Sequence, residues 1–295
     1  MSVLDKVDVH NQEETYLTQK WEGLGQHIAY FLHSNTDIAV LTVFDSLYSV
    51  SVYSVYNMII SHIQSLTTSF VSGMEALFGD MLAKKEYDEL NRTFDLYETL
   101  ISMVSVILLG VTMVVILPFV KLYTAGVNDA SYNQPLLALF MILAALMYCW
   151  RFPYHSMIIA AGHFRQTRTA AYAEAGLNIA LSLILVNKTG LPGVACATMI
   201  ATFLRFVYYV AYLSRNIISR DIKFFCKRFF VNILSLSISV SAGLFISGNF
   251  SIENYFMWII CSAVSGVLTV IITAGINFIF YKNAFSKIMK KFSRI

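Results

Sequence analysis

The sequence predicts an all-α, polytopic integral membrane protein, a bundle of eight transmembrane helices with both termini in the cytoplasm. Composition is the first reason: 57% of the 295 residues are hydrophobic and only 13% are charged, against roughly 25% charged residues in soluble domains. Apolar tracts long enough to cross a bilayer recur along the chain, which is the second reason. The third is that the short alternating segments of a closed β-barrel, the other architecture that spans membranes, are missing from the sequence.

The chain opens with a polar stretch, residues 1–20, which carries four acidic side chains. A secretory leader instead begins with a charged region followed by an apolar one. We therefore expect residues 1–20 to form a cytoplasmic segment.

Eight apolar tracts follow, and each is close to the roughly 20 helical residues that a hydrocarbon core of about 30 Å requires. They cover residues 22–46, 48–78, 96–120, 134–161, 168–187, 191–214, 229–248 and 255–281. Turn signals at 162–168 and 187–193 predict that the fourth, fifth and sixth helices form antiparallel hairpins. The basic tail at 282–295 is expected to lie against anionic lipid.

The distribution of basic residues predicts the orientation. With the first helix running outward, only four of the 21 Lys and Arg residues lie away from the cytoplasmic side. Lys121 and Lys188 lie on the outer side, while Arg151 and Arg205 fall within helices. This asymmetry follows the positive-inside rule and indicates a cytoplasmic (inner) membrane protein. Because the basic residues stand in blocks between apolar tracts, we expect no nucleic-acid partner.

Motifs of soluble enzymes are absent from the sequence: it has no GxGxxG, GxxxxGK[ST], HExxH or GxSxG. Its histidines are scattered, and its four cysteines show no metal-ligand spacing. We therefore expect no enzyme activity, no metal and no cofactor.

Five short segments, in order along the chain, resemble prokaryotic oligosaccharide flippases of the multidrug, oligosaccharidyl-lipid and polysaccharide exporter superfamily. They are residues 35–41 (NTDIAVL), 50–56 (VSVYSVY), 160–167 (AAGHFRQT), 174–179 (EAGLNI) and 190–198 (GLPGVACAT). The resemblance implies two six-helix lobes around a central cavity, sometimes with two further helices at the carboxyl end. It also implies transport of an undecaprenyl-diphosphate-linked oligosaccharide from the inner to the outer leaflet.

The chain departs from that plan, because it matches only the second lobe and the two extra helices. The expected divisions are an inter-lobe linker at 1–20, a six-helix lobe at 21–217, two additional helices at 218–281 and a tail at 282–295. The expected partners are membrane lipids, the lipid-linked oligosaccharide and a missing amino-terminal lobe. The expected function is that of the carboxyl-terminal half of a flippase for surface polysaccharide biosynthesis.

Ionisable side chains within the bilayer are rare and usually face a cavity or one another, so Asp37, Arg151, Glu174 and Arg205 are candidate functional residues. Asp37 is either a hydrogen-bonded residue near a helix end or a site of proton or cation coupling. A guanidinium suits a diphosphate, because its fixed donors match phosphate oxygens. Arg151 and Arg205 are therefore candidate diphosphate ligands, with a structural role as the alternative.

Residues equidistant from the turn of an antiparallel hairpin lie at the same depth. This rule pairs Glu174 with Arg205 across the outer turn, and Arg151 with Asn178 and His155 with Glu174 across the cytoplasmic one. Glu174 and Asn178 also share a helix face, because they are four residues apart. We predict one polar network, in which Glu174 faces Arg205 or His155 and Arg151 is close to Asn178. Either Glu174 merely neutralises an arginine, or Arg151 stays free for the diphosphate.

Three tyrosines, Tyr48, Tyr53 and Tyr56, begin the second predicted helix near the outer surface. Tyrosines at this depth are typical interfacial anchors. Stacking on sugar rings is the alternative.

Three other functions are compatible with this sequence. The first is half of a multidrug efflux-type transporter, in which the cavity would be more acidic than basic. The second is an integral-membrane glycan transferase, which would need a larger loop than the short ones predicted here. The third is a structural subunit without transport of its own.

Overall fold

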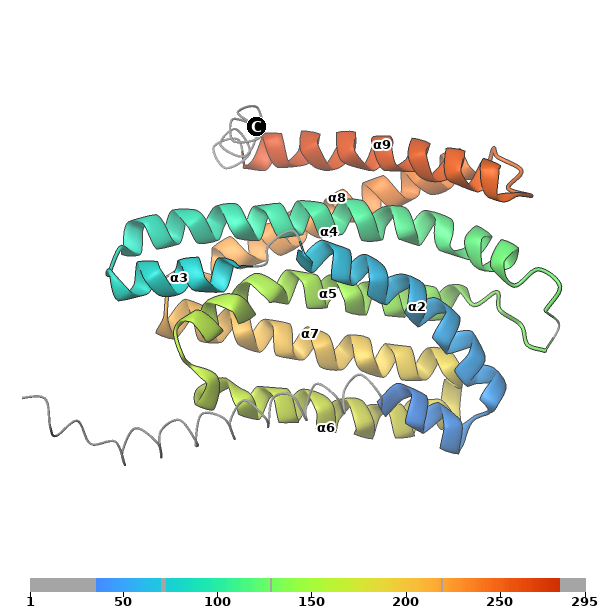
Figure 1. Cartoon of the computed structure of the whole chain (residues 1–295), viewed down its shortest axis with the longest axis horizontal. Coiled ribbons are helices and arrows are strands. Elements are labelled where there is room, and N and C mark those ends of the chain that lie inside the picture. Colours follow the sequence, from blue (N-terminus) through green and yellow to red (C-terminus); the bar gives the residue numbers. More distant parts are fainter. Residues whose placement is uncertain (1–35, 70–72, 128, 219, 282–295) are drawn as a thin grey trace, which may run out of the picture.

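The computed structural model describes residues 36–69, 73–127, 129–218 and 220–281, and these are helical with no strand (Figure 1). A helical segment at 36–44 comes first. The labelled helices are α2 (Leu47–Ser69), α3 (Met74–Ala83), α4 (Tyr87–Tyr123), α5 (Pro135–Ala160), α6 (Phe164–Thr189), α7 (Leu191–Asn216), α8 (Ile222–Ser247) and α9 (Tyr255–Phe280). The all-α prediction is confirmed for this part of the chain.

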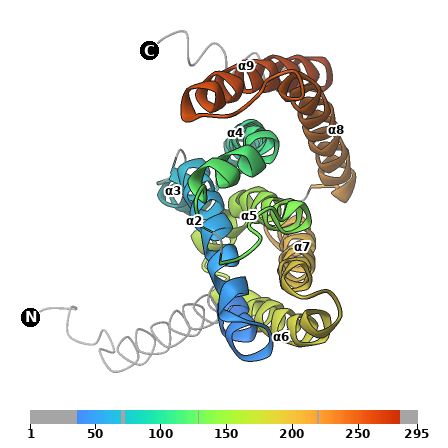
Figure 2. The ribbon, with the colours of Figure 1, turned by 90° about the vertical axis from the view of Figure 1, so that its right-hand side faces the viewer.

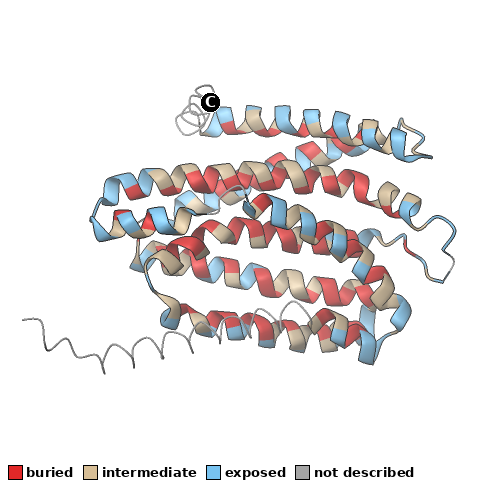
Figure 3. Cartoon of the chain, viewed as in Figure 1, coloured by how far each residue is buried: buried red, intermediate tan, exposed pale blue. Residues whose placement is uncertain are grey.

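Helix α5 lies at the centre of the arrangement. It packs against α2, α3, α4 and α7, while α6 packs on α7. Helices α8 and α9 pack on each other and on α4. Seen end-on, α9 and α8 lie at one edge and α6 at the opposite edge (Figure 2). The buried residues concentrate on α4, α5 and α7 in the middle of the bundle (Figure 3).

Six of the described helices, α4 to α9, are long and apolar enough to cross a membrane by length and composition. Helices α5, α6, α7 and α9 begin and end close to the predicted boundaries, whereas α8 begins at Ile222, seven residues before the predicted 229. Helix α4 is longer than the predicted 96–120, because it already begins at Tyr87. The acidic residues Asp88 and Glu89 therefore lie in its first turn, where negative charge is favoured by the helix dipole.

The second predicted span, 48–78, was wrong as a single helix. Helix α2 ends at Ser69, and α3 begins at Met74 after Gly73, whose φ of 94° is left-handed. Glycine is the residue that adopts this conformation without steric cost. Helix α2 is also not among the six apolar candidates. The first predicted span, 22–46, lies outside the described residues except for its helical end at 36–44.

The two predicted hairpin turns are present. Helix α5 ends at Ala160 and α6 begins at Phe164, with Gly162 at φ 71° between them. The second turn consists of one residue, Gly190 at φ 62°, between α6 and α7. This tight turn forces α6 and α7 to pack as direct antiparallel neighbours.

Candidate functional site

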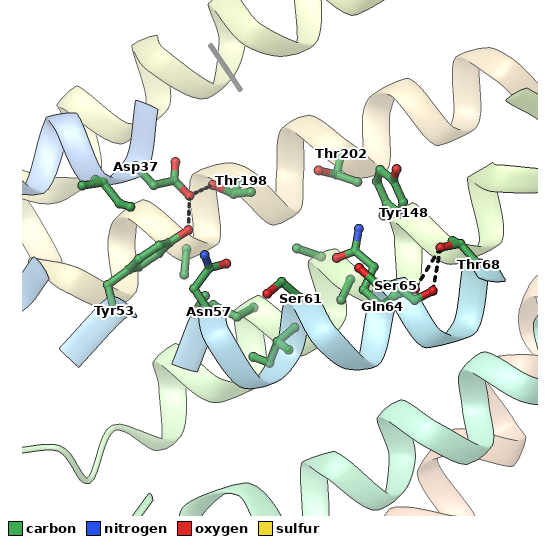
Figure 4. Close-up of a pocket in the computed structure, with 16 residues that line it drawn as sticks. Asp37, Tyr53, Asn57, Ser61, Gln64, Ser65, Thr68, Tyr148, Thr198 and Thr202 are labelled. Carbon is green, nitrogen blue, oxygen red and sulfur yellow. Dashed lines mark hydrogen bonds between the residues drawn. The ribbon is translucent and has the colours of Figure 1, made fainter. Parts of the chain in front are cut away.

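A cavity of about 440 Å³ opens between the 36–44 segment, α2, α5 and α7 (Figure 4). Its volume lies in the range of roughly 300–1,000 Å³ typical of small-molecule sites. Most of the lining side chains are hydroxyls, amides or small apolar groups. The lining residues are Asp37, Ile38, Tyr53, Asn57, Ile60, Ser61, Gln64, Ser65, Thr68, Met141, Ala144, Ala145, Tyr148, Ala195, Thr198 and Thr202.

Helix α2 contributes the polar wall of this cavity. Asn57, Ser61, Gln64, Ser65 and Thr68 all line it. Their spacing of three and four residues places them on one face of a helix, and Figure 4 shows them along the same side of α2. This polar face helps to explain why α2 is not among the six helices that are apolar enough to cross a membrane. Its polar residues face a cavity rather than lipid.

Asp37 lies at one end of the cavity and is buried. Among the described residues, three neutral groups donate hydrogen bonds to its carboxylate. The Tyr53 hydroxyl is 2.8 Å away, the Thr198 hydroxyl 2.7 Å and the Asn178 side-chain amide 3.2 Å. These donors come from α2, α7 and α6, so the carboxylate joins three helices to the 36–44 segment. Donors of this kind stabilise a buried charge that would otherwise be costly.

Glu174, Arg151 and Arg205 form a second site, which we name the central cluster. Arg151 donates to Glu174 at 2.7 Å, and Arg205 donates to the other carboxylate oxygen. The three side chains are 1%, 7% and 12% exposed, respectively. Arg205 also donates to the Tyr209 hydroxyl at 2.7 Å. The cluster therefore clamps α5, α6 and α7 together through one carboxylate.

The predicted contact between Glu174 and Arg205 is present. Arg151 differs from the prediction, because it binds Glu174 whereas Asn178 binds Asp37. Hairpin arithmetic gives only the depth of a residue, and a side chain as long as arginine reaches a carboxylate about one turn away. The neighbour of Arg151 is consequently the charged Glu174 and not the neutral Asn178, so Arg151 is not free to bind a diphosphate.

Neither arginine of the central cluster lines the cavity. The guanidinium of Arg151 lies 5.0 Å from the centre of the Tyr148 ring, and Tyr148 does line it. His155 stacks on Tyr209 with the ring centres 5.7 Å apart. Within the described part of the chain its Nδ1 atom is buried without a hydrogen-bond partner. His155 therefore does not use its Nδ1 atom for the predicted contact with Glu174.

A further ion-pair site, which sequence reasoning missed, joins α4 to α8 and to the linker before it. This peripheral cluster consists of Asp95, Glu98, Arg220 and Arg228. Glu98 pairs with Arg220 at 2.7 Å, and Asp95 pairs with Arg228 at 2.7 Å. Burial by itself lowers the pKa of Arg220, but Glu98, Tyr154 and Asp95 together outweigh burial and raise that pKa above its usual range. A sequence signal existed, because Asp95 and Glu98 are three residues apart on one helix face.

The three tyrosines at the start of α2 are not a set of interfacial anchors. Tyr53 and Tyr56 are buried, and only Tyr48 is exposed. Tyr53 donates to Asp37, as described above. The Tyr56 hydroxyl donates to the carbonyl of Tyr132 at 2.7 Å and accepts from the backbone of Gln134 at 3.1 Å. These contacts, with Asp37 of the 36–44 segment and with the connection between α4 and α5, could not be predicted from the position of the tyrosines near a predicted surface.

Metal-binding groups of three or more His, Cys, Asp or Glu side chains do not occur among the described residues. The described lining of the cavity offers hydroxyl and amide groups for hydrogen bonding and one buried carboxylate. The cavity can accept a polar molecule along α2. The buried carboxylate of Asp37 is the ionisable group at its end.

The fold is similar to that of a solved membrane transporter. The chain superimposes on the lipid II flippase MurJ, in an inward closed conformation, with a TM-score of 0.64 and 17% sequence identity. The match covers 92% of this chain and 54% of the MurJ chain, so the protein spans about half the length of that flippase. No family model matches the sequence, and no curated protein matches it either.

Proposed function

We propose that this chain is one half of a flippase that moves an undecaprenyl-diphosphate-linked oligosaccharide across the cytoplasmic membrane. The observation that carries the proposal is the fold, which resembles a lipid II flippase over nearly the whole chain. A polar cavity on a bundle of apolar helices supports it. A lipid-linked glycan needs both features, because its sugars must cross the hydrocarbon core away from lipid.

The proposed topology has eight membrane crossings and cytoplasmic termini. In this topology α2 and α3 together form the second crossing, and the 22–46 tract forms the first. The six-helix lobe covers 21–217, the two additional helices cover 218–281, and 1–20 and 282–295 lie in the cytoplasm. A partner lobe completes the pathway, since the similarity extends over only 54% of the flippase chain.

Within this function, Asp37 is our candidate for coupling transport to a proton or cation. Its carboxylate lies at the cavity and joins α2, α6 and α7 through neutral donors. A change in its charge would alter bonds to all three helices at once. Asn178 is the residue that carries this effect to α6.

Direct binding of the diphosphate by Arg151 or Arg205 stays a prediction. The geometry favours the structural alternative, because both guanidinium groups are paired with Glu174 and neither lines the cavity. His155, stacked on Tyr209, belongs to the same structural layer.

One observation favours a second candidate, half of a multidrug efflux-type transporter. The described charge at the cavity is the acidic Asp37 rather than an arginine, and an acidic cavity suits cationic drugs. The glycan transferase alternative has no comparable support, because no exposed catalytic acid or histidine lines the cavity among the described residues.

Complementation of a flippase-depleted strain tests the proposal. The chain is expressed alone and together with an amino-terminal six-helix lobe of a two-lobe exporter, and stable insertion is checked in the membrane fraction. We expect growth only when both lobes are present. Growth with the chain alone would refute the half-transporter, whereas no growth with both stable lobes would refute the flippase. Resistance to the lipophilic cation tetraphenylphosphonium, without growth rescue, would instead support drug efflux.

A further inference from the structure

We propose that the peripheral cluster is a water-binding site, in which ordered water occupies two small cavities beside Tyr154 and Phe225 and joins α8 to α4. The inference goes beyond the proposed function, because these cavities share no lining residue with the cavity of Figure 4. It names the bound molecule, the groups that hold it and the route by which it enters.

The first argument is the space beside the cluster. An inner cavity of about 10 Å³ lies between α4, α5, α7 and α8. An outer cavity, also of about 10 Å³, lies beside the linker that precedes α8. Each volume is at the lower limit of the roughly 10–15 Å³ that one water molecule needs. Each cavity therefore suits a single water molecule and no larger ligand.

The second argument is the hydrogen bonding of Arg228, which lines the inner cavity. Its terminal nitrogens donate to Thr99 at 2.6 Å and to Asp95 at 2.7 Å. Its buried Nε atom has no hydrogen-bond partner among the described residues. The Glu98 carboxylate lies 3.5 Å from Nε, beyond the roughly 2.7–3.2 Å of a direct bond. A water molecule beside this pair accepts from Nε and donates to the carboxylate.

Two further polar groups complete the inner site. Ser102 of α4 and Asn232 of α8 line the cavity, and each is 4% exposed. Neither side chain makes a hydrogen bond to a described residue. Most buried polar groups in proteins have a partner in the protein or in ordered water. A buried water makes about three hydrogen bonds, and Arg228, Glu98, Ser102 and Asn232 together offer enough donors and acceptors.

The third argument is a route from the solvent. Asp221, which lines the outer cavity, is exposed, so water reaches that cavity directly. Tyr154 and Phe225 line both cavities and therefore stand between the outer and the inner water. The Tyr154 hydroxyl donates to Glu98, which fixes one side of this partition. The ring of Phe225 forms the other side and controls exchange between the two cavities.

X-ray radiolytic footprinting in ¹⁸O-labelled water tests the inference on the chain in lipid nanodiscs. Hydroxyl radicals formed from bound water oxidise the side chains beside it, and mass spectrometry measures the products. Tyr154 and Tyr97 are a matched pair, because both are 3% exposed and only Tyr154 lines these cavities. We expect Tyr154 to be oxidised at least about fivefold faster, as a residue beside buried water. Equal rates would overturn the inference.

A variant that fills the inner cavity assigns the signal to it. Asn232→Leu removes the amide and adds volume, and Asn249→Leu, at an exposed position just beyond α8, is the control. Trp150 is the reporter, because it lines the inner cavity and is 3% exposed. We expect its oxidation to fall about threefold or more in Asn232→Leu alone, since the water has lost its space and a partner. Unchanged oxidation of Trp150 would contradict the site, and Ser102→Val gives the same reading if Asn232→Leu does not insert stably.

Opening the partition should have the opposite effect. Phe225→Ala removes the ring between the cavities, and Phe224→Ala, whose side chain is 59% exposed, is the control. We expect oxidation of Trp150 to rise about twofold or more in Phe225→Ala alone, with Tyr97 unchanged, because water enters the inner cavity more freely. No rise, or an equal rise in Phe224→Ala, would overturn the assigned route. None of these measurements involves a cargo, so failure here is distinct from failure of complementation.

Discussion

The central and peripheral clusters both bury ion pairs, but they differ in how many carboxylates hold the arginines. In the central cluster one described carboxylate, Glu174, serves two arginines. In the peripheral cluster two carboxylates serve two arginines, and one of them, Asp95, is 42% exposed while Glu98 is 3% exposed. Breaking a buried pair leaves an uncompensated charge. The charges of both arginines in the central cluster are therefore balanced by the single carboxylate of Glu174, whereas in the peripheral cluster two carboxylates balance them.

The two clusters also join different parts of the molecule. The central cluster joins α5, α6 and α7, and two of these helices, α5 and α7, line the cavity. The peripheral cluster joins α8 to α4. The first is expected to fix the shape of the lobe. The second is expected to fix where α8 and α9 sit on it.

The largest expected effect is that of Glu174→Gln. This change leaves two buried guanidinium groups without their shared counter-charge, and we expect a loss of about 3–5 kcal/mol in the free energy of unfolding. Thermal unfolding in detergent measures it. Arg151→Gln is the matched comparison, and it should cost less because Glu174 keeps Arg205. A loss for Glu174→Gln equal to or smaller than that for Arg151→Gln would contradict the claim that the Glu174 carboxylate alone stabilises both arginines.

Glu98→Gln should have the next largest effect, about 3 kcal/mol, because Glu98 is buried against Arg220 and Arg228 and Asp95 remains as a second acceptor. Asp95→Asn should cost only about 0–1 kcal/mol, as for other partly exposed pairs. The same unfolding assay compares the two variants. If Asp95→Asn proved as costly as Glu98→Gln, the greater exposure of Asp95 would not reduce its contribution to stability, and the prediction would be wrong.

Thr198→Val tests the neutral donors of Asp37, as a contrast to both charged clusters. It removes a hydrogen bond of 2.7 Å to the carboxylate but leaves those of Tyr53 and Asn178. We expect a loss of about 1.5–3 kcal/mol, the range for a bond to a charged group. Thr42→Val, on the exposed side of the same region, is the control and should change stability little. Equal losses would show that the Asp37 network contributes nothing specific.

Gly243→Ala tests how closely α8 packs on α4 near the end of α8 that is remote from the peripheral cluster. An added Cβ would lie 2.7 Å from Cγ2 of Val114, which is a stiff β-branched side chain. We expect a loss of about 1–2 kcal/mol from overpacking. Gly266→Ala on α9 is the control, because nothing lies within 4 Å of its added Cβ. A neutral Gly243→Ala variant would indicate looser packing between α8 and α4.

Much of the fold could be predicted from the sequence, because hydrophobic length and turn residues are local signals. The boundaries of α5, α6, α7 and α9 followed from them, and so did the turns at Gly162 and Gly190. The break at Gly73 was missed, since apolar residues continue on both sides of it. The polar face of α2 was also missed, although its spacing of three and four residues is visible in the sequence.

The contacts of the candidate site also divide into those that local sequence signals predict and those that they do not. The Glu174–Arg205 contact could be predicted because a one-residue turn fixes the register of α6 and α7. The Asp37–Asn178 bond joins residues 141 positions apart, and no local rule says which helices of a bundle become neighbours. The peripheral cluster was missed because Arg220 and Arg228 were assigned to a cytoplasmic loop. Basic residues that orient a protein in the membrane can also form buried pairs at a helix end.

The most direct test of the proposed half-transporter is translocation in proteoliposomes. A fluorescent undecaprenyl-diphosphate-linked oligosaccharide is placed in both leaflets, and dithionite, which quenches only the outer leaflet, reports its movement. We predict that the chain together with an amino-terminal lobe moves the lipid until all of it is quenched, whereas the chain alone leaves the inner-leaflet fraction protected. Complete quenching with the chain alone, or protection with both lobes stably inserted, would contradict the account.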